Sequence, residues 1–404
     1  MSARAEASSR GFDWSRLSGP RAIAIAGIVL GALAFWLALP PLKSRTAFVP
    51  LLIGILAIAA GIWAATRGQR RLGWGAIVAG LVGIAGGVLA TRSSAADLDI
   101  VVVWSALGAA TLRYATPLTF AALGGLFAER SGVVNIGLEG MMLMGAFFGI
   151  WANAESGSWV VGILAAMAAG GLLALIHAFF SIHLRADQIV SGTAVNFLAL
   201  GITGYLYIDL YGDQGTPSVS GIPDVRLSFL DDVYFLGPIF AQLNLMIWIS
   251  FALLIATYVV MFKTKVGLRI RSVGEHPRAA ETVGISVYRT RYAAVTVSGM
   301  LAALGGAYLS IGFVHAFGEN MTAGKGFIGL AALIFGNWRP FGAFGAALLF
   351  GFSSALAQRL PDAYGTSSGT LFETLPYVLT LIAVAGVIGR SRPPAAVGRP
   401  YQKQ

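Results

Sequence analysis

Asn135 and Glu139 are the polar side chains that stand out in an otherwise apolar, membrane-like stretch of this sequence. The stretch runs from Glu129 to Gly149 and begins with a charged pair, Glu129 and Arg130. If the stretch is helical, two residues four positions apart lie on one face of it. A carboxylate is costly in lipid, so we expect this face to meet protein, water or a partner. The pattern predicts an element that shapes a route across a membrane.

The composition is that of a helical membrane protein. Of 404 residues, 56% are hydrophobic and 11% are charged, whereas soluble domains carry about 25% charged residues. The apolar runs are continuous and do not alternate, which excludes a β-barrel. The 52 glycines favour closely packed and broken helices. We therefore expect an all-α fold, a polytopic transmembrane bundle of about 12 hydrophobic segments.

The apolar runs divide the chain into regions. The hydrophobic segments lie at 21–41, 47–66, 73–91, 101–127, 129–149, 158–183, 188–211, 242–262, 292–314, 322–337, 341–360 and 372–390. Two glycine-rich stretches, 124–149 and 324–351, occupy comparable places in two halves. This predicts an internal duplication with short re-entrant or broken helices. The predicted regions are an N-terminal segment (1–20), extra N-terminal transmembrane helices (21–95), a main transmembrane domain (101–390) and a tail (391–404).

The net charge of +10 is explained by topology, because Lys and Arg gather in loops on the cytoplasmic side of membrane proteins. We expect no nucleic-acid partner. The loop at 263–291 holds seven basic residues against Glu275 and Glu281, so it is placed in the cytoplasm. The alternation of spans then predicts a multi-pass protein of the cytoplasmic (inner) cell membrane with both termini cytoplasmic. The sequence has no cysteine, which excludes disulfides.

The residues offer no catalytic machinery. Gly324-Lys325-Gly326 lacks the spacing and the Ser or Thr of an ATP-binding loop, so we expect any ATPase to be a separate subunit. The four histidines, at 177, 183, 276 and 315, are dispersed. No metal site, cofactor or enzyme activity is predicted.

The basic loop contains a short helical signal at 273–285. Pro277 suits the first turn of a helix and Gly284 suits its end, which predicts a surface helix of about two turns. A solvated basic loop is the alternative. A transporter without its own motor would use such a helix to dock into a groove of a partner.

The sequence resembles the integral-membrane permease subunits of bacterial ABC importers, in the branch with ribose, branched-chain amino acid and nucleoside permeases. The resemblance is strongest to nucleoside and simple-sugar permeases that work with basic-membrane-protein-type lipoprotein receptors. It spans about 101–390, and four motifs carry it in order: P-L-T-F-A-A-L-G-G-L-F-A-E-R-S-G-V-V-N-I-G-L-E-G-M-M-L-M-G-A-F at 117–147, A-D-Q-I-V-S-G-T-A-V-N-F-L-A-L-G at 186–201, V-G-E-H-P-R-A-A-E-T-V-G-I at 273–285 and G-K-G-F-I-G-L-A-A-L-I-F-G-N-W-R-P at 324–340.

This resemblance implies a permease subunit that imports a small polar solute. A nucleoside is the first expectation, and a simple sugar such as ribose or a branched-chain amino acid is the alternative. It implies three protein partners besides the lipid bilayer. These are a cytoplasmic ATP-binding cassette subunit, a second related permease subunit in a heterodimer and an extracytoplasmic substrate-binding lipoprotein. It places ATPase coupling at Gly274, Glu275, Pro277, Arg278, Ala279, Ala280 and Gly284. The first three spans depart from the family pattern, and the resemblance implies nothing about them.

A base or a ribose needs amide and carboxylate partners and an aromatic face for stacking. We therefore predict substrate contacts from Asn135, Glu139, Asn196 and Phe327. For each polar residue the alternative is a structural brace between helices. A secondary transporter with Glu139 as proton carrier is a competing hypothesis, which the coupling motif disfavours. A structural or receptor-type membrane protein is disfavoured by polar residues in several spans.

Overall fold

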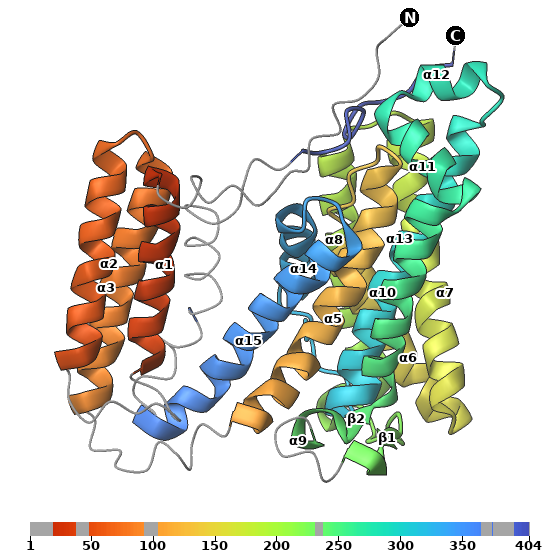
Figure 1. Cartoon of the computed structure of the whole chain (residues 1–404). Helices are drawn as coiled ribbons and strands as arrows, with labels where there is room; N and C mark the ends of the chain where they lie inside the picture. Colours follow the sequence, from red (N-terminus) through yellow and green to blue (C-terminus); the bar gives the residue numbers. More distant parts are fainter. Residues whose placement is uncertain are drawn as a thin grey trace, which may run out of the picture. The chain divides into compact units, whose positions relative to one another are not determined.

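The structure is a computed structural model that describes residues 19–37, 48–92, 104–230, 237–364, 374 and 392–403. The chain divides into two compact units (Figure 1). Unit 1 comprises 1–104 and 357–389, and unit 2 comprises 105–356 and 390–404. The predicted main domain at 101–390 stays a prediction, since residues 357–389 fall in unit 1 with the N-terminal spans.

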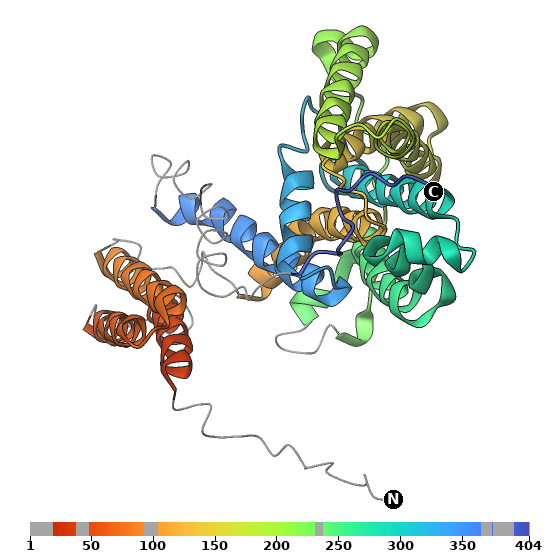
Figure 2. The ribbon, with the colours of Figure 1, turned by 90° about the horizontal axis from the view of Figure 1, so that it is seen from above.

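Three helices make up the described start of unit 1, namely α1 (Pro20–Leu37), α2 (Phe48–Thr66) and α3 (Arg70–Arg92). They pack side by side (Figures 1 and 2), and glycines allow the contact. A Cβ added at Gly31 would lie 2.5 Å from the Ala79 backbone, and one added at Gly61 would lie 2.6 Å from the Gly73 carbonyl. Close contact through small residues is typical of helices that associate in lipid.

The remaining elements follow from residue 104. The helices are α5 (Trp104–Arg130), α6 (Leu138–Ser156), α7 (Trp159–Ala178), α8 (Gln188–Tyr211), α9 (Gly237–Phe240), α10 (Leu245–Lys263), α11 (Lys265–Glu275), α12 (Pro277–Thr282), α13 (Val287–Ala307), α14 (Lys325–Phe335) and α15 (Pro340–Tyr364). Two π-helical turns, η2 (Phe179–His183) and η5 (Tyr308–Val314), extend α7 and α13. Two 3₁₀ turns, η3 (Gly212–Gln214) and η4 (Ser228–Leu230), lie in the loop after α8.

The core of unit 2 forms around α6 and α13, which pack on each other and on α7. A Cβ added at Gly306 would lie 1.8 Å from the Met142 carbonyl oxygen, and one added at Gly145 would lie 2.3 Å from that of Ala303. The two backbones therefore touch without intervening side chains. Most of α6 is buried, which is why its sequence shows no polar face.

Six described helices are long and apolar enough to cross a membrane: 48–66, 159–183, 188–211, 245–263, 287–314 and 340–358. The predicted count of about 12 segments is not confirmed by this set, and the segment at 372–390 lies outside the described residues apart from Thr374. Helix α14 has 11 residues, so it is about 16 Å long, about half of a bilayer's hydrocarbon core. It is a short helix, as its glycine-rich sequence predicts.

The all-α prediction missed one small sheet. Strands β1 (Asp224–Arg226) and β2 (Gln242–Asn244) pair antiparallel within the long loop that precedes α10, with Val225 opposite Leu243. Each strand has three residues, which is too short for an alternating pattern to be visible in the sequence.

Candidate functional site

The connection between α5 and α6 is a buried, non-helical stretch at 131–137. Gly132 has a φ of +92°, a left-handed conformation that favours glycine and ends α5. Asn135 therefore lies in the connection, whereas Glu139 lies in the first turn of α6. The sequence places both residues on one face only if the whole stretch is helical, and the break within 129–149 means that this condition is not met.

Side chains from α7 and α8 satisfy the backbone of the connection. The Gln188 side-chain oxygen accepts a hydrogen bond from the Val134 N–H at 2.7 Å. The His177 Nε2 lies 3.0 Å from the Val134 carbonyl oxygen, and Asn196 Nδ2 donates to the Ile136 carbonyl oxygen at 3.0 Å. Irregular backbone inside a membrane protein persists where protein groups replace the missing helical bonds. The connection is therefore held in one defined conformation by side chains of the surrounding helices of unit 2.

Asn135 ties the connection to α13. Its side chain is fully buried, and its Nδ2 donates to the Ser298 hydroxyl at 2.9 Å. The side-chain oxygen of Asn135 has no hydrogen-bond partner among the described residues. Asn135 thus braces the connection against a helix from the other half of the chain.

Glu139 joins the starts of two helices. Its Oε1 accepts the Gly324 N–H at 2.8 Å and its Oε2 accepts the Gly326 N–H at 2.6 Å. Both donors belong to the N-terminal end of α14, where N–H groups lack helical partners, and Glu139 itself lies in the first turn of α6. One carboxylate therefore faces two positive helix ends. The Lys325 ammonium adds a further positive charge that interacts with Glu139.

Asn196 completes the start of α6. Its side-chain oxygen accepts the Gly140 N–H at 2.8 Å, which is one of the unpaired donors of the first turn of α6. Phe327 follows Gly326 on α14, and its ring is 46% exposed. The structure therefore gathers Glu139 and Asn196 at the start of α6, with Asn135 in the connection before it and Phe327 on an open side of α14.

Left-handed residues flank α14 on both sides. Before it, His315, Asn320 and Ala323 have φ of 60°, 52° and 44°; after it, Asn337 and Trp338 have φ of 54° and 51°. The left-handed backbone conformation costs about 1–2 kcal/mol for a residue other than glycine. Strain of this kind persists where surrounding contacts fix it and is common at functional sites.

The charged pair at the end of α5, Glu129 and Arg130, holds the left-handed turn that follows α14. Glu129 accepts a hydrogen bond from the Trp338 indole N–H, and Arg130 donates to the Trp338 carbonyl oxygen from Nε at 3.0 Å and from Nη2 at 2.7 Å. The pair that opens the polar stretch in the sequence therefore clamps the turn between α14 and α15.

The predicted coupling segment forms two helices. Helix α12 begins at Pro277, as predicted, and Gly284 after its end has a φ of +82°. It has six residues, fewer than the predicted two turns. The sequence does not predict the preceding helix, α11, because its dense basic residues are typical of a cytoplasmic loop. Large apolar side chains on this surface stay exposed, with Leu268 57% and Val283 75% accessible.

One of the predicted coupling residues, Gly274, contacts the end of α5 directly. A Cβ at Gly274 would lie 2.1 Å from the Arg130 carbonyl oxygen, so α11 rests on that corner. Glu275, Pro277, Arg278 and Ala279 are among the residues that line a surface groove. Ala280 is buried against the neighbouring helices.

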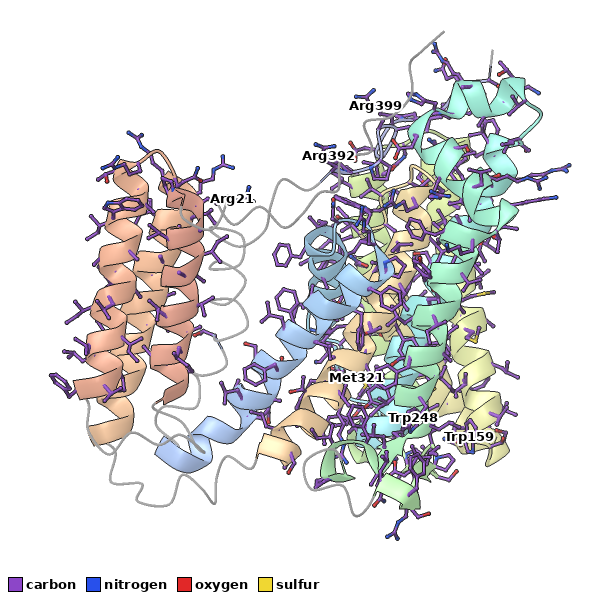
Figure 3. All side chains as sticks on the ribbon, viewed as in Figure 1. Arg21, Trp159, Trp248, Met321, Arg392 and Arg399 are labelled. Atoms are coloured by element: carbon purple, nitrogen blue, oxygen red, sulfur yellow. The ribbon has the colours of Figure 1, made fainter. Side chains whose placement is uncertain are left out.

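Sequence reasoning missed the importance of Arg291, which was noted only as one of the loop's basic residues. Arg291 is 1% exposed in α13. Its Nε donates to the Ser131 carbonyl oxygen at 3.2 Å and its Nη1 to the Arg399 carbonyl oxygen at 3.2 Å. A guanidinium within an apolar helix was the available signal. Figure 3 shows Arg392 and Arg399 at the end of unit 2 that carries α11 and α12.

Comparison with known proteins gives consistent matches. Residues 107–384 match the family described as branched-chain amino acid transport system / permease component. The guanosine ABC transporter permease protein NupQ of Bacillus subtilis is 44% identical over 334 residues, covering 76% of this chain and 99% of NupQ. The nucleoside ABC transporter permease protein NupC of Lactococcus lactis is 39% identical over 304 residues, covering 72% of this chain and 95% of NupC.

The protein named putative glucose ABC transporter permease protein TsgC13, of Haloferax volcanii, is 34% identical over 255 residues, covering 62% of this chain and 76% of TsgC13. No solved structure matches this chain.

Proposed function

The chain belongs to the branched-chain amino acid transport system / permease component family, and from this premise we propose that it is the permease subunit of an ABC importer for nucleosides. The observation that carries the proposal is the 44% identity to a guanosine permease over 99% of that protein's length. A multi-pass membrane protein with several long apolar helices fits this role. The membrane is proposed to be the cytoplasmic (inner) membrane.

A simple sugar is the second candidate solute. The 34% identity to a permease assigned to glucose favours it, because one scaffold serves different solutes in this family. The higher identities to two nucleoside permeases, 44% and 39%, place the nucleoside first.

The proposed motor is a separate ATP-binding cassette subunit that docks on α11 and α12. Exposed apolar residues such as Val283, 75% accessible, beside basic side chains suit a protein contact better than bulk water. A second, related permease subunit and an extracytoplasmic substrate-binding lipoprotein complete the proposed assembly. Both ends of the chain are proposed to lie on the ATPase side, and residues 392–403 already lie beside α12.

A continuous series of contacts leads from this surface into unit 2. Gly274 of α11 rests on Arg130, and Arg291 bonds Ser131 in the adjoining connection. The connection leads into α6, whose Glu139 holds the start of α14. We propose that ATP-driven movement of α11 and α12 reaches the half-length helix α14 through these contacts, which is a form of alternating access.

The proposed route passes the place where α6 and α14 meet. Discontinuous helices that begin at membrane depth form solute sites in many transporters. Glu139 and Asn196 bond backbone groups there, and Asn135 bonds the Ser298 hydroxyl. Their proposed influence on the solute therefore includes the positions of the two helix starts. Phe327, with its ring 46% exposed, is the proposed aromatic contact for a base.

Reconstitution separates this proposal from a proton-driven transporter. The chain alone and the complete importer are placed in separate proteoliposomes, and uptake of labelled guanosine is measured with ATP or with a proton gradient. We expect uptake only by the complete importer supplied with ATP. Uptake by the chain alone under a proton gradient would overturn the proposal and favour Glu139 as a proton carrier.

A further inference from the structure

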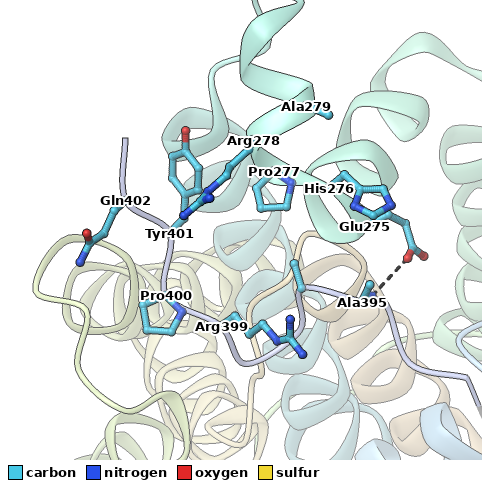
Figure 4. Close-up of a pocket in the computed structure, with 11 residues that line it drawn as sticks. Glu275, His276, Pro277, Arg278, Ala279, Ala395, Arg399, Pro400, Tyr401 and Gln402 are labelled. Atoms are coloured by element: carbon cyan, nitrogen blue, oxygen red, sulfur yellow. Dashed lines mark hydrogen bonds between the residues drawn. The ribbon is translucent and has the colours of Figure 1, made fainter. Parts of the chain in front are cut away.

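The C-terminal strap, residues 392–403, runs across the end of unit 2 that carries α11 and α12 (Figures 2 and 4). Three backbone hydrogen bonds hold its first half. The Arg392 N–H donates to the Asn337 side-chain oxygen at 2.9 Å. The Ala395 N–H donates to Glu275 Oε2 at 3.1 Å, and the Ala396 N–H donates to the carbonyl oxygen of Gly274 at 2.9 Å. The strap therefore bonds two residues of the coupling motif.

Tyr401 anchors the second half of the strap. It is 5% exposed and shares a small apolar core with Val273, Ala280 and Val287. Its hydroxyl donates to the Glu281 carboxylate. Burial, together with this bond, raises the pKa of Tyr401 to about 12, so the phenol stays protonated and able to donate at neutral pH. The core under α12 thus depends on a side chain from the strap.

A groove of about 730 Å³ lies between the strap and α12 (Figure 4). Its lining comprises Glu275, His276, Pro277, Arg278, Ala279, Ala395, Ala396, Arg399, Pro400, Tyr401 and Gln402. The lining contains two guanidinium groups, from Arg278 and Arg399, and one carboxylate, from Glu275, which already accepts the Ala395 N–H. The charge of the groove is therefore positive on balance and complementary to an acidic segment.

We infer that the strap is the second wall of the ATPase docking site, and that the groove between α12 and the strap receives an acidic segment of the ATP-binding subunit. The inference rests on the proposed function, in which that subunit docks on α12. It adds a second contact surface, which reaches α13 through the bond from Arg291 to the Arg399 carbonyl oxygen. A partner seated in the groove would hold α12 and the strap together.

The chain contains no cysteine, so single-cysteine variants can report on this surface. Gln402→Cys lies in the groove, Ala279→Cys lies on α12, and Arg392→Cys lies on the strap outside the groove lining. Maleimide labelling is measured on the permease pair with and without its cognate ATP-binding subunit. We expect the subunit to slow labelling several-fold at positions 279 and 402 and to leave position 392 unchanged.

The three positions separate the possible failures. Protection of Ala279→Cys with equal labelling of Gln402→Cys in both preparations would overturn the strap inference and leave docking on α12 intact. Absence of protection at both positions would overturn docking on α12 as well. Protection at all three positions would show general shielding of this face and would contradict the groove as the specific contact.

Charge reversal tests the acidic partner. Arg399→Glu places a negative charge in the groove, and Arg392→Glu makes the same change outside it. We expect Arg399→Glu to weaken binding of the ATP-binding subunit about tenfold and Arg392→Glu to leave it unchanged. Unchanged binding with Arg399→Glu, or equal weakening by both variants, would contradict an acidic segment in the groove.

Discussion

Glu139 shows how one side chain can organise two helices. Its two oxygens accept the Gly324 and Gly326 N–H groups, so the carboxylate closes the start of α14 while lying in the first turn of α6. Hydrogen bonds to a charged group are worth about 1.5–3 kcal/mol, and leaving a buried N–H unpaired has a comparable cost. The residue therefore serves as a brace whether or not it also touches the solute.

Replacing Glu139 tests this brace. Glu139→Ala removes both acceptors, so we expect loss of uptake and a destabilisation of about 2–4 kcal/mol, read as a lower melting temperature in detergent. Glu139→Gln keeps one acceptor oxygen and should reduce uptake with a smaller stability loss. Glu155→Gln, at an exposed position near the end of α6, is the matched control. Wild-type uptake by Glu139→Gln and Glu155→Gln alike would remove Glu139 from the route.

The sequence is enough to single out Glu139, because a carboxylate within an apolar run is rare and demands a partner. It is not enough to identify that partner, since Gly324 lies 185 positions further along the chain. For the same reason, Arg291 was counted as one of several basic residues, although its burial and its bonds to two distant carbonyl groups set it apart.

At the scale of elements, the informative features are breaks and short helices. Helix α12 was predictable because Pro277 and Gly284 carry their own backbone preferences. The glycine-rich stretch 124–149 predicts a broken or re-entrant helix, but the sequence does not place the break at 131–137, where Ser131, Gly132, Asn135 and Gly137 lie among apolar residues. Side chains from other helices stabilise that break, and such tertiary support leaves no local signal.

The contact between α11 and the end of α5 gives an element-scale prediction. A methyl group in Gly274→Ala would lie 2.1 Å from the Arg130 carbonyl oxygen, so α11 must shift away from α5. We expect membrane insertion to continue and uptake to fall to background, measured in cells that express the complete importer. Gly318→Ala is the control, since an added Cβ there meets nothing within 4 Å. Normal uptake by Gly274→Ala would show that the contact between α11 and α5 does not transmit the ATP-driven movement.

At the scale of the molecule, the chain combines a family domain with an N-terminal addition. The family match begins at residue 107, close to the boundary between the two units at 104. The three N-terminal helices pack on one another through glycines, which explains why they consist mostly of small and apolar residues. The predicted internal duplication stays a prediction, as does the role of these helices.

Function at this scale depends on assembly. Unit 2 carries the proposed docking surface for the motor at α11 and α12. The starts of α6 and α14 meet elsewhere in this unit, and Arg130, Ser131 and Arg291 connect the two places. The solute is less directly encoded in this chain, because the proposed substrate-binding lipoprotein is the proposed source of much of the selectivity. Selectivity is therefore best measured on the complete system.

Competition uptake in cells expressing the complete importer tests the central claim most directly. Uptake of labelled guanosine is measured against unlabelled nucleosides, pentoses, glucose and branched-chain amino acids, with an ATPase-deficient strain as the control. We expect nucleosides alone to compete, and uptake to disappear in the control strain. Competition by a sugar or an amino acid with none by nucleosides, or full uptake without the ATPase, would contradict a nucleoside-importing ABC permease.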